Sequence, residues 1–274
     1  MDFTLLPLAV TPILLLVHVI WMVDSPRREP IGNVVRYLVA GALAGAAAIV
    51  AEMLLAPIEA RLGDPRLTWP VRLLFVFVGV GLLEETCKFG VLAAASRGDR
   101  ALDEPFDWVV YAVSVSLGFA ALENVRVLWQ GAHAGWSRAV FAVPVHALLG
   151  TLMGYHLARA MRDGPATATR RRWLAVLEPA AWHTVYDHSI FEMRAAKDLS
   201  APRVLLFLVI VAALWTLAVR RTASLWRSEQ GLPPPILAPG RTLARLIGRT
   251  SPRSPAENEA AGAEDRPGND RGGS

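Results

Sequence analysis

The sequence predicts an all-α membrane protein, a bundle of about seven transmembrane helices followed by a polar tail. Of its 274 residues, 53% are hydrophobic, against roughly 45–50% in ordinary soluble domains. The apolar residues gather in runs of about 20, the length that a helix needs to cross a bilayer. Basic residues collect in alternate connections between these runs, as they do in multi-pass membrane proteins.

Each predicted span is one apolar run. We interpret the first as a retained span, because Asp2 replaces the basic start of a signal peptide and no small-x-small cleavage site follows. The second contains Gly41-x-x-x-Gly45, a spacing that lets helices pack closely. In the fifth, His146 shares a face with Gly150 and Gly154, so a neighbouring helix can approach it. The spans cover about 3–23, 34–56, 70–95, 106–129, 138–161, 173–191 and 202–219.

The distribution of arginine predicts the orientation. One set of alternate loops carries most of the arginines and the opposite loops carry few. Because basic loops stay in the cytoplasm, we expect the amino terminus outside and the carboxyl terminus inside. This rule also explains the excess of 28 Lys+Arg over 24 Asp+Glu, so no nucleic-acid partner is implied. The arginines on the predicted cytoplasmic side are Arg27, Arg28, Arg97, Arg100, Arg162, Arg170, Arg171, Arg172 and those after residue 219.

The composition changes after Arg220-Arg221. Residues 223–274 are rich in Pro, Gly, Ser, Glu and Arg and lack an apolar period, which is typical of a disordered segment. We therefore expect a polytopic membrane domain over residues 1–222 and a disordered cytoplasmic tail over 223–274. The single cysteine, Cys87, excludes an internal disulfide and is expected to pack inside the membrane rather than act as a nucleophile.

The third predicted span carries charge near its middle. Glu84, Glu85 and Lys88 stand there, and each ionised side chain at such a depth costs about 2.5–3.5 kcal/mol on insertion scales. Lys88 follows Glu84 by one helical turn and Glu85 by three residues, so its ammonium can pair with either carboxylate. Two adjacent carboxylates in a poorly solvated place should not both stay ionised. One could therefore be a base, and the other a proton reservoir or a partner of Lys88.

Three further spans carry polar groups at a compatible depth. Under the predicted orientation, all of them fall between the bilayer centre and the outer face. Such groups are costly in a membrane and by default indicate a functional site, here one that is open to water from outside. They are Glu123 and Asn124 in the fourth span, His146 in the fifth, and His183 and Asp187 in the sixth.

This set of side chains is suited to metal-assisted hydrolysis. Catalytic zinc is commonly held by three protein ligands, two histidines and a carboxylate among them, while a separate glutamate acts as general base. Glu123, His146 and His183 could supply the zinc ligands. Glu84 or Glu85 would then transfer protons.

Two further residues have candidate roles in the same site. Asp187, one turn after His183, could orient a histidine, and Asn124 could donate a hydrogen bond to a developing oxyanion. A metal-free reaction is the alternative, in which a glutamate activates water and a histidine stabilises the oxyanion. The residues alone do not separate the two chemistries.

Four motifs follow one another on successive predicted helices. They are Glu84-Glu85-x-x-Lys88, Gly118-Phe119-Ala-x-x-Glu123-Asn124, His146-Ala-x-x-x-x-x-x-Gly154 and His183-x-x-x-Asp187. These motifs resemble those of the PrsW-type intramembrane protease family. That family is related to the CAAX-protease and bacteriocin-processing membrane enzymes, in which a histidine stands at the position of Glu123. The resemblance covers about Leu73 to Ile190 of the chain.

The resemblance implies a multi-pass enzyme of a bacterial-type cell membrane. Its activity would be that of a metalloprotease, or a glutamate-dependent protease, that cleaves membrane-anchored proteins near the outer face. In some members of the family the substrates are anti-sigma factors of envelope-stress signalling. Relatives often have asparagine where Asp187 stands, and an anion is a poor oxyanion donor, so a ligand or orienting role suits Asp187 better.

Two other classes of protein fit part of the pattern. A proton- or cation-coupled transporter also uses intramembrane carboxylates and histidines, but many transporters show inverted repeats and this sequence has none that we detect. A catalytically inactive scaffold would not need the complete motif set. The sequence does not specify the substrate, the cleavage position or the oligomeric state.

Overall fold

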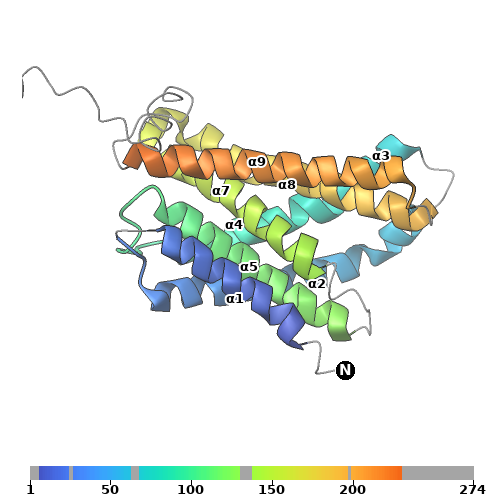
Figure 1. The fold of residues 1–274 in the computed structure, drawn as a ribbon, viewed down its shortest axis with the longest axis horizontal. Coiled ribbons are helices and arrows are strands. Elements are labelled where there is room, and N and C mark those ends of the chain that lie inside the picture. The colour runs from blue at the N-terminus through green and yellow to red at the C-terminus, as the bar shows by residue number, and fades with distance from the viewer. Residues whose placement is uncertain (1–5, 25–26, 63–67, 130–137, 197–198, 230–274) are drawn as a thin grey trace, which may run out of the picture. The chain divides into compact units, whose positions relative to one another are not determined.

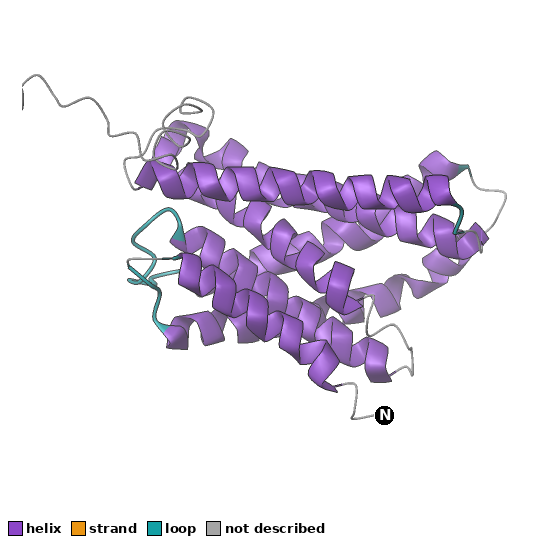
Figure 2. Ribbon diagram, in the orientation of Figure 1, coloured by secondary structure: helices purple, strands orange, loops and turns teal. Residues whose placement is uncertain are grey.

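The computed structural model describes residues 6–24, 27–62, 68–129, 138–196 and 199–229, and their regular structure is entirely helical (Figures 1 and 2). The described helices up to Trp226 belong to one compact unit. No strand occurs in the described ranges, which confirms the all-α prediction.

Helices occupy the position of each predicted span. The third span is a continuous path of α3, the π-helical turn η2 and α4, and the fifth joins the π-helical turn η3 to α7. The elements are α1 (Leu6–Val23), α2 (Ile31–Leu62), α3 (Trp69–Val76), η2 (Phe77–Leu82), α4 (Leu83–Ala95), α5 (Asp107–Trp129), η3 (Arg138–Ala142), α7 (Val143–Asp163), α8 (Pro165–Ala196) and α9 (Ala201–Glu229).

Four of the described helical segments are long and apolar enough to cross a membrane. α1 contributes a shorter apolar helix over Val10–Val23. Neither the third span, which includes α4, nor the helix α8 is among the four. Both carry charged and polar residues of the predicted site, and these residues lower the mean hydropathy of the two segments. The four segments are Ile31–Ala56, Asp107–Trp129, Arg138–Asp163 and Ala201–Glu229.

Two connections differ from the prediction. The basic run Arg170–Arg172, expected in a loop, lies inside α8, and only Gly164 separates α7 from α8. Gly164 has φ of 83°, a left-handed conformation that glycine adopts without strain and that ends a helix sharply. At the other end, α9 continues through Arg220-Arg221, so the boundary expected after residue 222 falls within that helix. Residues 230–274 lie outside the described part of the chain.

α5 is the central helix of this compact unit. It is apolar on all sides, its side chains are largely buried, and it packs against α1, α2 and α7 (Figure 1). The face of α7 that carries Gly150 and Gly154 packs closely against α5. A Cβ at Gly150 would lie 2.8 Å from the carbonyl oxygen of Ala112. His146 stands one turn before Gly150, so this close crossing holds its imidazole beside α5, with the ring centroid 5.8 Å from that of Phe119.

A second close crossing joins η2 to α8. A Cβ at Gly81 would lie 2.7 Å from the carbonyl oxygen of Ala180, so no larger residue fits without separating the two elements. Glu84 follows Gly81 by three residues and His183 follows Ala180 by three. The crossing therefore places Glu84 beside His183. π-helical turns often occur at functional sites, and both such turns here immediately precede a helix of the predicted site.

Candidate active site

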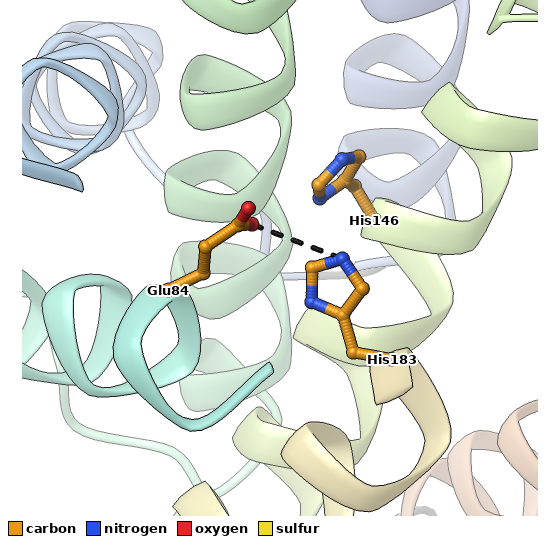
Figure 3. Close-up of side chains that lie close together, drawn as sticks. All are labelled: Glu84, His146 and His183. Atoms are coloured by element: carbon orange, nitrogen blue, oxygen red, sulfur yellow. Dashed lines mark ion pairs between the residues drawn. The ribbon is translucent and has the colours of Figure 1, made fainter. Parts of the chain in front are cut away.

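The structure brings together polar side chains from four helices. Figure 3 shows three of them, Glu84, His146 and His183, pointing toward one another from α4, α7 and α8. All three are buried, with 5%, 3% and 4% of their surface exposed. The convergence that the sequence predicts is therefore present in the fold.

Lys88 joins the two carboxylates of α4. Its Nζ donates to Glu85 Oε1 at 2.7 Å and to Glu84 Oε2 at 3.4 Å, and it lies 4.1 Å from the centroid of the Phe119 ring. Lys88 and Glu85 are completely buried. A lysine in such a place is stable only because its charge is matched, so the ammonium holds the acidic pair in position.

Glu85 contacts the Nδ1 side of the His183 ring. Its Oε1 lies 3.0 Å from His183 Nδ1, and we assign the ring proton to that nitrogen because a carboxylate can only accept. Nε2 then presents its lone pair to the side where Glu84 Oε2 lies at 3.8 Å and Asp187 Oδ2 at 3.5 Å. Carboxylates hold metal-binding histidines in this way. The orienting position expected for Asp187 is thus taken by Glu85.

His146 is held from both sides. Its Nδ1 lies 3.3 Å from Lys88 Nζ and accepts from it, and its Nε2 lies 2.9 Å from Glu123 Oε2. Glu123 also forms an ion pair with Arg138, whose Nη2 is 2.9 Å from the same oxygen. Because Nδ1 accepts from Lys88, the ring proton lies on Nε2, which donates to Glu123 Oε2.

Arg138 is a site residue that the sequence did not single out. It lies at the start of η3, where an arginine in an outer loop looks like an ordinary interfacial residue. Its Nε donates to Asn124 Oδ1 at 2.6 Å. Asn124 is 3% exposed and does not line the neighbouring cavity, whereas Arg138 does. Arg138 therefore presents the hydrogen-bond donors that the sequence assigned to Asn124.

A cavity of about 630 Å³ opens beside these groups. Its polar wall includes Glu84 and Glu123 but neither Glu85 nor Lys88, so Glu84 is the member of the acidic pair that reaches the cavity. The volume and the apolar wall suit a segment of extended peptide with hydrophobic side chains. The polar wall consists of Glu52, Glu84, Glu123, Arg126, Arg138, His146, His183, Tyr186, Asp187 and Arg194; the apolar wall includes Phe141, Val145, Ile190, Val204, Phe207 and Leu208.

A metal-binding geometry exists within the site. Glu84, His146 and His183 each offer one ligand atom, and these three atoms lie within 4.8 Å of one another. Two imidazole nitrogens and a carboxylate oxygen are a donor set that zinc accepts. The sequence expected Glu123 as the carboxylate ligand; the structure groups Glu84 with the histidines and places Glu123 against His146 and Arg138.

His156, ten residues after His146 on α7, is not part of this site. Its imidazole contacts the Glu178 carboxylate of α8, and Arg221 of α9 lies 2.5 Å from the same oxygen. The three side chains connect α7, α8 and α9 at a different level of the bundle.

Comparison with known proteins gives a consistent result. A family model described as "PrsW family intramembrane metalloprotease" matches residues 29–217. The protein named Protease PrsW of Geobacillus kaustophilus is 31% identical over 85% of this chain and 97% of its own length, and that of Clostridioides difficile is 29% identical over 78% and 88%. Protease PrsW of Bacillus subtilis is 36% identical over 40% of this chain and 51% of its own. No solved structure matches.

Proposed function

Because the chain belongs to the PrsW family of intramembrane proteases, we propose that it is a metal-dependent endopeptidase that cleaves membrane-anchored proteins. It is a multi-pass protein of the bacterial cell membrane, with four apolar helices able to span it. The observation that carries the proposal is the convergence of Glu84, His146 and His183 on the wall of one cavity.

The metal proposed for the site is zinc, held by one ring nitrogen of His146, by His183 Nε2 and by Glu84. Binding of the metal would replace one of the two ring contacts of His146. The contact of Glu85 with His183 Nδ1 supports this assignment, because it leaves Nε2 free to ligate. Bound zinc would lower the pKa of a water molecule that it holds and would polarise the scissile carbonyl. Asp187, 3.5 Å from His183 Nε2, is a candidate further ligand.

Glu123 and Arg138 are proposed to act on the substrate. Glu123 lies on the cavity wall beside His146 Nε2, in position to accept a proton from the attacking water and return it to the leaving amine. Arg138 would donate hydrogen bonds to the carbonyl oxygen as its negative charge develops. Glu85, Lys88 and Asn124 would position these groups without touching the substrate. In a metal-free reaction the same cavity would use Glu84 as the base.

We propose that the chain crosses the membrane seven times, with the amino terminus outside, the carboxyl terminus in the cytoplasm and the site in the outer half. The ion pair of Arg27 with Asp103, 3.5 Å apart, supports this arrangement, because it joins the first and third connections at one end of the bundle. The membrane domain would then lie over residues 1–222 and a cytoplasmic tail over 223–274. Substrates would be single-span proteins of the anti-sigma-factor kind, cut near the outer face.

The proposal is tested with purified protein in proteoliposomes that contain a single-span reporter. We expect the wild type to cut the reporter near the outer end of its span, and His146→Ala to leave it intact, because that change removes both a ligand and the partner of Glu123. His18→Ala is the matched control, since His18 is an exposed histidine of α1, and it should retain full activity. Mass spectrometry of the products identifies the bond. An intact reporter with the wild type, or full cleavage by His146→Ala, would contradict the proposal.

A further inference from the structure

A second group of buried carboxylates lies far from the candidate active site. Asp24 follows α1, Glu29 precedes α2, and Asp107 is the first residue of α5. One oxygen of each lies within 4.8 Å of the others, and the residues are 5%, 5% and 1% exposed. Asp107 and Glu123 are separated along α5 by about 24 Å at the helical rise per residue, so the two sites are distinct.

No ion pair formed by the described residues includes Asp24, Glu29 or Asp107. Two arginines stand close to the group in the sequence and make their contacts with other residues. Arg27 pairs with Asp103 and Glu104, and the guanidinium of Arg28 lies over the Trp21 ring, 5.0 Å from its centroid. Buried carboxylates are normally paired or coordinate a metal ion, and within the described part of the chain no ion pair joins this group to a cationic side chain.

Hydrogen bonds satisfy part of the group. The backbone N–H of Glu29 donates to Asp24 Oδ2 at 2.8 Å, and the hydroxyl of Tyr111 donates to Glu29. The backbone N–H groups of Asp103 and Glu104 donate to Asp107 Oδ2 at 2.9 and 2.6 Å.

No hydrogen-bond donor among the described residues reaches Asp107 Oδ1, although the atom is fully buried. A buried acceptor without a donor in a native structure requires an explanation, and an ion is one of the few that also fits two neighbouring carboxylates. The spacing of the oxygens is compatible with an ion, because three atoms within 4.8 Å of one another lie no more than about 2.8 Å from a common centre, close to the Ca²⁺–O distance of about 2.3–2.6 Å.

We propose that Asp24, Glu29 and Asp107 bind a hard divalent cation of the Ca²⁺ and Mg²⁺ class. All three ligands are oxygens, which these ions prefer, and no nitrogen or sulfur ligand belongs to the group. The bound ion ties the connection between α1 and α2 to the start of α5, the central helix. The three carboxylates therefore form a structural cation site, separate from the zinc site proposed above.

The test uses the full-length protein in detergent, treated with a chelator and then titrated with CaCl₂ or MgCl₂ alone by isothermal titration calorimetry. We expect one ion per chain and a rise in the melting temperature on binding. Asp107→Asn should weaken the affinity by at least about tenfold, since even outer substitutions near a metal cost 10–100-fold. Its amide oxygen can still accept from the backbone N–H groups of Asp103 and Glu104, so the turn is preserved.

Three further variants complete the test. Glu29→Gln gives a second measurement if Asp107→Asn does not fold. Asp163→Asn is the matched control, because Asp163 is held by Arg159 and Arg171 outside the group, and it should leave binding unchanged. The His183→Ala variant should still bind the Ca²⁺ or Mg²⁺ ion. This result would distinguish that ion from the catalytic metal. Binding of neither cation by the wild type, or binding unaffected by both Asp107→Asn and Glu29→Gln, would overturn the proposal.

Discussion

Glu123→Gln is expected to lower the rate of peptide cleavage by about 10²–10⁴-fold while leaving the bound metal in place, the loss typical of a missing proton acceptor. Glutamine keeps an oxygen for Arg138 and nearly the same shape, but it cannot take a proton from water. The contacts of Glu123 with His146 and Arg138 define the geometry that this variant preserves. The measurement is single-turnover cleavage of the reporter, with metal content determined on the same sample.

Glu84→Gln is the informative counterpart. Because Glu84 groups with both histidines, the same isosteric change there should remove metal as well as activity. Glu192→Gln is the control: this glutamate of α8 pairs with Arg72, 2.9 Å away, on a partly exposed surface, where an ion pair contributes little. If Glu123→Gln retained wild-type rates, Glu123 would not be the proton acceptor; if Glu84→Gln kept its metal, Glu84 would not be a ligand.

Lys88→Met is expected to destabilise the protein by about 3–5 kcal/mol and to abolish cleavage, because it leaves two buried carboxylates without their cation. Lys88 donates to Glu84, Glu85 and His146. Unfolding by denaturant in detergent micelles measures the stability, and reporter cleavage measures the activity.

A double variant separates the effect of charge from that of shape. Lys88→Met combined with Glu85→Gln removes one negative charge along with the positive one, and the glutamine oxygen can still accept from His183 Nδ1. We expect the double variant to recover most of the lost stability. A single Lys88→Met variant as stable as the wild type would show that the ammonium does not hold the acidic pair.

The convergence of the site was predictable because polar groups in apolar spans are few and costly. Their spacing within each span, such as Lys88 after Glu84 and Glu85, also predicted the local ion pairs that the structure contains. The spacing of residues could not predict the rotation of each helix about its own axis. That rotation is set by close backbone crossings such as Gly81 against Ala180, which decide that Glu84 groups with the histidines.

Three other features were not predicted from the sequence, for related reasons. Arg138 begins a predicted span, where arginines commonly lie at the interface, so nothing in its local sequence marks it as a site residue. The arginine run before the sixth span was expected in a loop because basic residues mark cytoplasmic loops, yet arginine is also a good helix former and α8 includes the run. Asp24 and Glu29, in the connection between α1 and α2, meet Asp107, the first residue of α5, only through the fold.

The central claim is that two histidines and a carboxylate from three helices hold a catalytic metal. The most direct test is elemental analysis of the purified chain beside His146→Ala and His183→Ala, with cleavage assayed on the same preparations. Calcium and magnesium are not counted as the catalytic metal, because we propose that these ions bind to Asp24, Glu29 and Asp107. The account predicts one zinc ion per chain in the active wild type and neither zinc nor activity in the two variants. A wild-type protein that cleaves the reporter with no transition metal bound would contradict it.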